Sequence, residues 1–356
     1  MVGQIPQQKD IDHFSHLTKD FNTLFGINEI ELKTVLPSER DLNFLAIAKC
    51  PTGAEKEVVM KVFEDAIDPT TLALRLRGLA AVSKAHPSLV QTLIKPLSGE
   101  YFVEIEGRFV AVVEFLPGQP LAYFRSSNNV SPDLLRDIGR AVGVVSSCLA
   151  EEFKDIPAEL DLPDFTWDIR NFSQIVGKYV HLVAERDREL GRIVREQAIE
   201  VQVSLRGLTL PCQVCQNDAN EYNIIVNEGD GSGKEHVGIL DFGDLCYTYR
   251  VADLSICLAY LWLVLAGRWR HGEITPLVIE GFQSAVPLNE DEKKAIIPLA
   301  IARVCTSISV AARNISEEPD NHYHRVSQES AVSLMRKLPS HSITEVTSAK
   351  CIKDGH

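Results

Sequence analysis

The segment of residues 215–244 constrains the fold of this chain more than any other, because it has the pattern of a β-hairpin with polar residues at both ends. Two short apolar runs, I-I-V and V-G-I-L, flank a polar turn that contains G-D-G-S-G, which indicates two antiparallel strands. Asp218 and Asn223 precede the first strand, and Asp241 and Asp244 follow the second. Because the outer ends of an antiparallel hairpin lie side by side, we expect Asp218, Asn223 and Asp241 to meet there.

These three residues have the order and spacing of the catalytic residues of protein kinases, in which an Asp, an Asn five residues later and the Asp of a D-F-G tripeptide follow one another. Phosphoryl transfer requires a group that orients or deprotonates the attacking hydroxyl, and oxygen ligands for Mg2+. Asp218 suits the first role, and Asn223 and Asp241 suit the second. Either motif alone is also a common set of turn residues. Both motifs around one hairpin favour a kinase.

The hairpin resembles the catalytic segment of the aminoglycoside phosphotransferase family, H-G-D-x-x-x-x-N followed by I-D-F-G-D. The resemblance is greater to one branch of that family, hydroxylysine kinase, and it covers about residues 8–340. The matching stretches are L-P-S-E-R-D-L-N-F (36–44), V-V-M-K (58–61), E-F-L-P-G-Q-P-L (114–121), G-I-L-D-F-G-D (238–244) and, more loosely, D-F-T-W-D-I-R-N-F (164–172). The implied fold is α+β and protein-kinase-like, with an N-terminal lobe built on an antiparallel sheet and a mainly helical C-terminal lobe.

The apolar pattern agrees with two lobes, which we place at residues 1–116 (nucleotide binding) and 117–340 (catalysis and acceptor binding), followed by a disordered tail at 341–356. The first lobe is expected to begin with one helix at 9–25 that ends at Gly26. Its strands are expected at 27–36, 43–50, 57–63, 101–105 and 108–115, with a helix at 68–84. The second lobe is expected to contain helices from 131 onward and at about 167–187, 190–206, 251–267, 275–284, 290–313 and 319–337.

Lys61 lies in an apolar strand, V-V-M-K-V, where burial of a cation is costly without an anionic partner. We interpret it as the Lys that binds nucleotide phosphates; the alternative is an edge-strand Lys that prevents aggregation. The turn at 36–44 has no glycine, so Ser38, Asn43 and backbone amides would have to cover the nucleotide. In a hinge at about 113–118, we expect backbone groups of residues 113–115, which include Glu114 and Phe115, to bind the purine edge.

The chain departs from the family pattern at two places. Gln216 and Asn217 replace the His and Gly that precede the catalytic Asp. The family His supports the loop by hydrogen bonding, whereas a Gln amide can donate a hydrogen bond but cannot be charged. We expect this change to affect the rate more than the fold. In the helix at 68–84, Arg75 stands where protein kinases place the Glu that pairs with the Lys.

Composition restricts the partners and the compartment. The net charge of −13 argues against nucleic acid or an anionic membrane as a partner. No apolar run reaches the roughly 18 residues of a membrane span, and the N-terminus lacks an apolar signal core. The eight cysteines are scattered, as free thiols are, which indicates the cytoplasm. Cys212 and Cys215 form one C-x-x-C, which we interpret as part of a strand beside the catalytic loop.

The resemblance implies that the acceptor is 5-hydroxy-L-lysine and the donor GTP, with ATP as the alternative donor and Mg2+ as the metal. An amino-acid acceptor needs an acid for its ammonium and an Arg for its carboxylate, and Asp244, Trp167 and Arg303 are candidates for that site. For Arg303 a structural salt bridge is the competing interpretation. Asp253 either braces the catalytic loop or caps a helix. Two alternative functions remain open. The chain could be a kinase for an aminoglycoside, a choline-like amine or homoserine, or it could be a pseudokinase that binds a nucleotide or metabolite without turnover.

Overall fold

The structure is a computed structural model that describes residues 8–38, 41–64, 66–126, 130–156, 160–227, 235–266, 269–318 and 328–337. The chain divides into two compact units, Met1–Pro117 and Gly118–His356. The sequence-based division after residue 116 differs from this boundary by one residue. Three predicted segments lie outside the described residues: the G-D-G-S-G turn, the helical residues 319–327 and the tail at 341–356.

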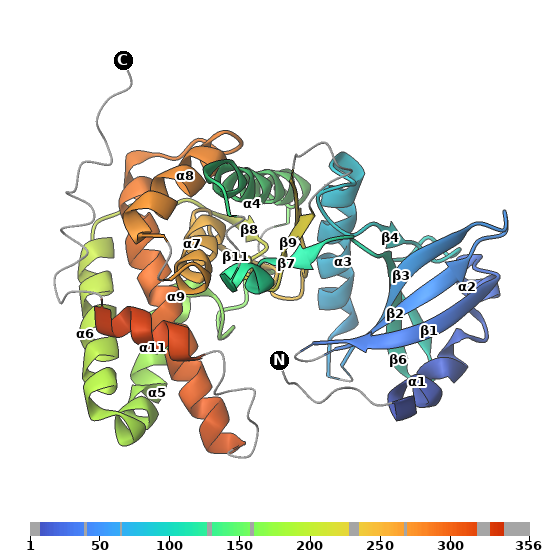
Figure 1. The fold of residues 1–356 in the computed structure, drawn as a ribbon, viewed down its shortest axis with the longest axis horizontal. Helices are drawn as coiled ribbons and strands as arrows, with labels where there is room; N and C mark the ends of the chain where they lie inside the picture. Colours follow the sequence, from blue (N-terminus) through green and yellow to red (C-terminus); the bar gives the residue numbers. More distant parts are fainter. Residues whose placement is uncertain are drawn as a thin grey trace. The chain divides into compact units, whose positions relative to one another are not determined.

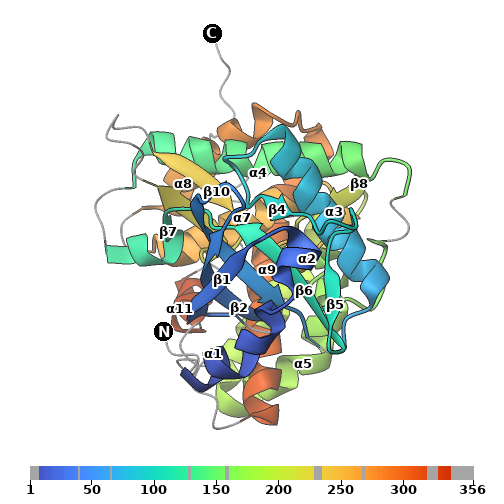
Figure 2. The same ribbon diagram turned by 90° about the vertical axis from the view of Figure 1, so that its right-hand side faces the viewer.

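The first unit contains a six-stranded antiparallel sheet of order β1-β2-β3-β6-β4, in which β5 also pairs with β6 (Figures 1 and 2). The strands are β1 (Glu29–Leu36), β2 (Leu42–Lys49), β3 (Glu55–Val62), β4 (Leu93–Ile94), β5 (Val103–Ile105) and β6 (Arg108–Glu114). Five strands lie where the apolar alternation predicts them. The sixth, β4, has only two residues, too few for an alternating pattern to be visible.

The N-terminal segment is not the single helix that its apolar spacing predicted. It forms α1 (Gln8–Phe14), the 3-10 turn η1 (Ser15–Thr18) and α2 (Phe21–Phe25). The side chains of Ser15 and Thr18 donate to backbone carbonyls three residues earlier, which competes with regular helix geometry. The buried aromatic residues still pack on the sheet as one layer. Gly26 ends α2 with a φ of 67°, as predicted.

One further helix of the first unit, α3 (Pro69–Ala85), begins where Asp68-Pro69 predicts it. The Asp68 carboxylate accepts a hydrogen bond from the Thr71 amide at 2.8 Å. This caps the helix, and proline at its first position has no amide that would need a partner.

The second unit is mainly helical (Figure 1). Its helices are α4 (Pro132–Glu152), α5 (Phe172–Arg186), α6 (Arg188–Leu205), α7 (Ala252–Val264), α8 (His271–Gln283), α9 (Glu290–Glu317) and α11 (Gln328–Lys337), and its 3-10 turns are η2 (Leu121–Ser126) and η4 (Ile169–Asn171). Helix α9 packs against α5, α6 and α7. Among the described helices, α9 alone is long and apolar enough to cross a membrane, but 83% of its apolar window is buried within the fold. It is therefore a core helix.

Glycines allow α4 and α8 to approach closely. A Cβ atom on Gly281 would lie 2.0 Å from the backbone oxygen of Arg136, and one on Gly139 would lie 2.1 Å from that of Val278. Both distances are far below van der Waals contact. The two helices can therefore pack at this separation only with glycine at these positions.

Two small sheets carry the hairpin and its neighbour. Strands β9 (Ile224–Asn227) and β10 (His236–Ile239) pair antiparallel, which confirms the predicted hairpin, and β7 (Gln119–Pro120) pairs with β9. A second pair joins β8 (Cys212–Cys215) to β11 (Cys246–Tyr249). The C-x-x-C is thus a strand, as predicted, and the seven described cysteines are free thiols.

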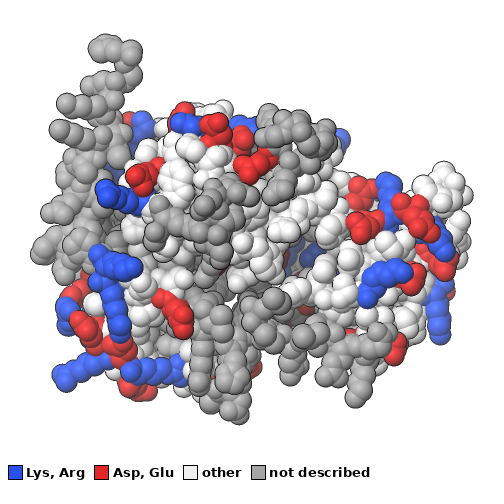
Figure 3. All heavy atoms as spheres, in the orientation of Figure 1, with Lys and Arg blue, Asp and Glu red and all other residues white. Residues whose placement is uncertain are grey.

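On the face of the molecule shown in Figure 3, the acidic and basic side chains of the described residues are intermixed. Some charged side chains of the described residues form exposed ion pairs, such as Arg192 with Glu196 at 2.6 Å. Exposed pairs of this kind contribute little to stability. Within the described part of this face, there is no basic patch of the kind that binds nucleic acid.

Candidate active site

The loop between β8 and β9 brings Asp218 and Asn223 into direct contact. The side-chain amide of Asn223 donates to Asp218 Oδ2 at 2.7 Å and to the Asp218 backbone oxygen at 3.0 Å. A third residue of the loop, Asn220, holds both. Its Oδ1 accepts from the amides of Tyr222 and Asn223, and its Nδ2 lies 3.0 Å from each carboxylate oxygen of Asp218. The carboxylate is therefore held in one orientation by two asparagines.

Asn220 was not identified from the sequence. An Asn two positions after an Asp is common in turns, and this local pattern was the one feature of the sequence that could have pointed to Asn220. Nothing in the linear sequence says that its side chain turns back onto the carboxylate.

The D-F-G-D segment lies beside this loop because β9 and β10 pair. The Leu240 amide donates to the Asn223 carbonyl at 2.8 Å, directly before Asp241. Asp241 has a φ of 60°, and its Oδ1 accepts from the Gly243 amide at 2.7 Å. The Asp241 side chain is exposed. Asp218, Asn223 and Asp241 thus come together at the end of the hairpin.

Gln216 connects the two segments. Its Oε1 accepts from the Asp218 amide at 3.0 Å, and its Nε2 donates to the carbonyls of Leu240, at 3.2 Å, and Asp241. The side chain is buried, with 2% of its surface exposed. One neutral amide therefore ties the catalytic loop to the D-F-G-D segment through both of its ends.

Asn217 stands where the family has glycine, and its backbone explains that preference. Its φ is 66°, in the left-handed region that favours glycine but that asparagine also adopts. Its side-chain amide donates to the Trp167 carbonyl at 3.2 Å. Replacement of the family's His-Gly by Gln-Asn is therefore compatible with the loop geometry.

Asp253, in the first turn of α7, braces the catalytic loop. Its carboxylate accepts from the amides of Gln216, at 3.3 Å, and Asn217, at 2.7 Å. The residue is 1% exposed, and burial raises its pKa to about 6 against the opposing effect of these hydrogen bonds. Of the two interpretations of Asp253, bracing of the loop is the one that the structure shows.

Arg303 reaches Asp218 from the middle of α9. Its NH2 group lies 3.2 Å from Asp218 Oδ1, its NH1 group donates to the Trp167 carbonyl at 3.2 Å, and its Nε lies 3.3 Å from the Tyr260 hydroxyl. The guanidinium carbon lies 4.5 Å from the centre of the Trp167 ring and 5.6 Å from that of Tyr260. Of the two interpretations of Arg303, acceptor binding and a structural salt bridge, the structure shows the buried salt bridge.

The electrostatic surroundings of Asp218 are dominated by acids. Burial raises the pKa of Asp218 well above its usual range, and the charges of Asp244 and Asp241 raise it further, while Arg303 opposes them. Asp244 is 5% exposed. Three carboxylates and one guanidinium thus act on one another here. The net formal charge of these four groups is negative, which suits a metal cation or the ammonium group of a substrate.

The residues at the hairpin end fit a magnesium ion. Mg2+ prefers carboxylate and amide oxygens. Because Asn223 turns its nitrogen toward Asp218, its oxygen is the atom left to ligate a metal, and Asp241 offers an exposed carboxylate. Clusters of three or more His, Cys, Asp or Glu side chains with metal-binding geometry do not occur in the described part of the chain. A magnesium site at this position would therefore need the Asn223 oxygen as one of its ligands.

Two other charged residues of the second unit, Arg170 and Glu151, are engaged in ion pairs. Arg170 pairs with Asp168 and Asp161, each at 2.6 Å, and Asp168 also accepts from Thr248. Glu151 pairs with Lys154 on the surface. These are structural contacts.

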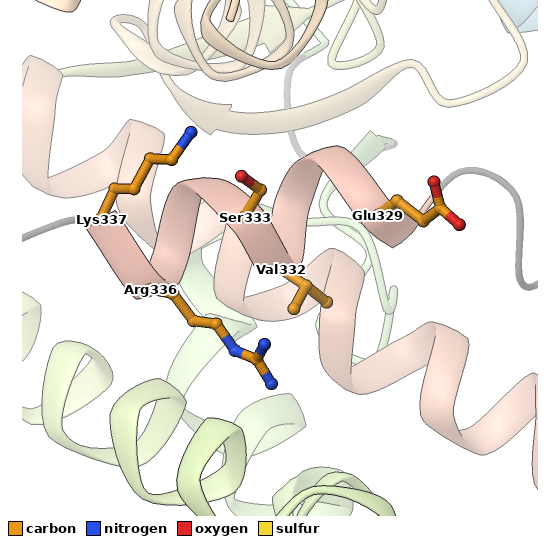
Figure 4. Close-up of a pocket in the computed structure, with 5 residues that line it drawn as sticks. All are labelled: Glu329, Val332, Ser333, Arg336 and Lys337. Atoms are coloured by element: carbon orange, nitrogen blue, oxygen red, sulfur yellow. The ribbon is translucent and has the colours of Figure 1, made fainter.

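A hollow of about 440 Å3 lies along α11, lined by Glu329, Val332, Ser333, Arg336 and Lys337 (Figure 4). All five belong to one face of that helix, and Arg336 pairs with Asp187. None of the residues around Asp218 lines it.

In the first unit, Lys61 and Asn43 are direct cross-strand neighbours on β3 and β2. The adjacent residues Phe44, Met60 and Val62 belong to the core beneath the N-terminal helices. Because side chains alternate along a strand, Lys61 and Asn43 lie on the opposite face of the sheet. Asn43 Oδ1 is buried there without a hydrogen-bond partner in the structure. Ser38 is exposed beyond the end of β1.

In the predicted hinge, two backbone amides have partners within the sheet. The amide of Glu114 donates to the Thr92 carbonyl at 2.8 Å, and that of Phe115 donates to the Glu57 carbonyl at 3.0 Å. The Glu114 side chain pairs with Lys56 at 2.7 Å. These two amides extend the pairing of β6 with its neighbours β4 and β3, so a purine would have to use carbonyl oxygens, or amides beyond residue 115.

Comparison with known proteins gives related kinases. Residues 50–276, which include both the Lys61 strand and the hairpin, match the phosphotransferase enzyme family, APH. Hydroxylysine kinase of Bos taurus is 27% identical over 322 residues, covering 84% of this chain and 81% of that protein. Hydroxylysine kinase of Xenopus laevis is 28% identical over 320 residues, covering 84% and 82%.

Two solved structures share the fold. A structure of the amicoumacin kinase hAmiN in complex with AMP-PNP and Ca2+ matches with a TM-score of 0.65 and 14% identity, covering 94% of this chain and 97% of that one. A microcompartment-associated aminopropanol kinase matches with a TM-score of 0.63 and 13% identity, covering 93% and 99%. The kinase-like fold is thereby confirmed. The chain belongs to the phosphotransferase enzyme family and is a small-molecule kinase that phosphorylates a hydroxyl group.

Proposed function

We propose that this enzyme transfers the γ-phosphoryl group of a purine nucleotide, GTP or alternatively ATP, to the hydroxyl of 5-hydroxy-L-lysine in the cytoplasm. The observation that carries the proposal is the contact of Asp218 with Asn223 beside Asp241, in an otherwise acidic setting. Free thiols at all seven described cysteines suit a reducing compartment.

In this mechanism, Asp218 accepts a hydrogen bond from the acceptor hydroxyl and orients its oxygen toward the γ-phosphorus. A bond forms between that oxygen and the phosphorus as the bond to the β-phosphate oxygen breaks, and the nucleoside diphosphate leaves. The hydroxyl proton passes to the Asp218 carboxylate. Asn220 and Asn223 keep the carboxylate in place during this step.

Asn223 and Asp241 would hold Mg2+ through their oxygens, and Lys61 would bind phosphate oxygens. When bound, Mg2+ supplies charge that stabilises the transferring phosphoryl group. The amicoumacin kinase was solved with a nucleotide analogue and a divalent cation, which supports a metal–nucleotide complex as the donor.

The choice of acceptor rests on chemistry and on relatives. The negative sum of charges around Asp218 and Asp244 suits an acceptor that carries an ammonium group. The matching curated proteins are hydroxylysine kinases, and one structural neighbour is an aminopropanol kinase. Hydroxylysine and aminopropanol are both amino alcohols.

A turnover assay tests the proposal. Purified protein with Mg2+ and either GTP or ATP is offered 5-hydroxy-L-lysine, 1-amino-2-propanol, choline, L-homoserine or an aminoglycoside, and L-lysine serves as the control without a hydroxyl group. We expect nucleoside diphosphate release with 5-hydroxy-L-lysine and none above background with L-lysine. If neither nucleotide supports transfer to 5-hydroxy-L-lysine, the proposed acceptor is wrong; nucleotide binding without transfer to any acceptor would favour a pseudokinase.

Two substitutions separate the assigned roles. Asp241→Ala should abolish binding of the metal–nucleotide complex, because it removes a metal ligand. Asp218→Ala should retain that binding and lose turnover. Calorimetric titration with Mg2+ and nucleotide measures the difference, and equal loss of binding in both variants would contradict the assignment.

A further inference from the structure

The contacts of Arg303 are unusual for a residue in the middle of an apolar helix. Its side chain is 3% exposed, and a buried cation requires compensation by partners within the protein. Each of its three nitrogens has a partner in the second unit, and two aromatic rings lie near the guanidinium. The planar group is therefore held in position from several sides.

The partner of its NH2 group is the proposed base itself. Asp218 Oδ1 receives Arg303 and Asn220, while Oδ2 receives Asn220 and Asn223. Among the described residues, Arg303 is the one cation found in contact with this carboxylate. It offsets the repulsion that Asp241 and Asp244 exert on Asp218.

We infer that Arg303 is a positioning residue for Asp218: it fixes the orientation of the carboxylate and keeps it in place among the neighbouring acids, without contacting the acceptor. The inference rests on the proposed role of Asp218 in the transfer. It replaces the sequence-based expectation that Arg303 binds the carboxylate of an amino-acid acceptor.

The two roles predict different kinetics. A residue that acts through Asp218 affects the transfer step for every acceptor. A residue that binds the acceptor carboxylate affects only acceptors that have one, and it affects mainly KM. The pair 5-hydroxy-L-lysine and its decarboxylated analogue, 1,5-diaminopentan-2-ol, isolates this difference because both present the same amino alcohol.

Arg303→Met and Arg303→Lys are compared with wild type on both acceptors. Arg303→Met should lower kcat by about tenfold to 150-fold on each, the range for loss of one hydrogen bond to a charged group. Arg303→Lys retains the charge but not the planar fork, so it should recover part of the loss. The matched control is Arg250→Met, which breaks another ion pair of a buried carboxylate, Glu292, within the same unit. It should leave kcat per folded molecule unchanged.

Two results would overturn the inference. A loss confined to 5-hydroxy-L-lysine and expressed in KM would show that Arg303 binds the acceptor carboxylate. A lower Tm with unchanged kcat on both acceptors would show that the residue serves stability alone.

A double-mutant cycle keeps the inference testable even if the acceptor is misidentified. The thermal unfolding of Asp218→Asn, Arg303→Met and the double variant is compared with wild type. We expect the double variant to lose less in Tm than the sum of the single variants, because the two residues share one interaction. Additive losses would refute the contact. If wild type transfers phosphate to no acceptor, the proposed function is wrong. The inference about Arg303 can still be tested in that case, by the double-mutant cycle and by the rate at which Arg303→Met hydrolyses the nucleotide with water as the acceptor.

Discussion

Replacement of Gln216 tests whether the amide that ties the catalytic loop to the D-F-G-D segment sets the rate. Gln216→His introduces the residue that the family has at this position. A neutral imidazole has one donor and one acceptor, whereas the Gln216 amide makes one accepted and two donated hydrogen bonds. Histidine can therefore retain the bond from the Asp218 amide and one of the two carbonyl contacts.

The expected effect follows from the loss of one hydrogen bond. A typical net contribution of about 0.5–1.5 kcal/mol corresponds to about a twofold to tenfold change in rate if it is expressed wholly in the transition state. Activity should therefore survive Gln216→His, and it would rise if the imidazole aligns the loop better. Gln216→Glu should be more harmful, because it places a carboxylate oxygen against the carbonyls of Leu240 and Asp241.

The assay is the initial rate of phosphoryl transfer, with Tm measured in parallel. Gln213→Glu is the matched control: Gln213 lies on β8, three residues before Gln216, and its amide donates to the backbone and hydroxyl oxygens of Ser146, away from the catalytic loop. It should lower Tm without a change in kcat. Wild-type activity in Gln216→Glu, or a loss far above about tenfold in folded Gln216→His, would refute the reasoning.

Two further predictions concern stability. Gly281→Ala should destabilise the second unit by about 1–3 kcal/mol, the range for overpacking, because the new methyl group would meet the Arg136 backbone at 2.0 Å; an unchanged midpoint of denaturant unfolding would contradict the close packing of α4 and α8. Asp253 has a folded pKa of about 6 against an ordinary value of 3.8, so its contribution to stability is fully present below pH 3.8 and is lost as pH rises through about 6. The loss amounts to about 3 kcal/mol. Wild type should therefore lose stability relative to Asp253→Asn between pH 4 and pH 7, and parallel pH profiles of the two proteins would contradict the assignment.

The sequence predicted those parts of the site that depend on local pattern. The hairpin was visible from two apolar runs around a turn, and antiparallel pairing then placed Asp218, Asn223 and Asp241 together. Asp68 and Gly26 marked helix ends because capping depends on neighbouring residues.

The parts that it missed depend on contacts between distant residues. The ion pair of Arg303 with Asp218 joins residues 85 positions apart, and the linear sequence gives no orientation for either side chain. The use of the Glu114 and Phe115 amides within the sheet likewise follows from tertiary pairing. The N-terminal helix was predicted as continuous because its apolar spacing is helical throughout, but local side-chain hydrogen bonds interrupt it.

The left-handed backbone of Asn217 and Asp241 has a consequence for engineering. A non-glycine residue in this conformation costs roughly 1–2 kcal/mol, so both residues are sites where a search for stabilising substitutions would favour glycine. Glycine at 217 would remove the hydrogen bond to Trp167, and glycine at 241 would remove the candidate metal ligand. Selection of this enzyme for thermostability alone should therefore tend to erode its activity through Asp241, whereas position 217 can accept the glycine that the family has there.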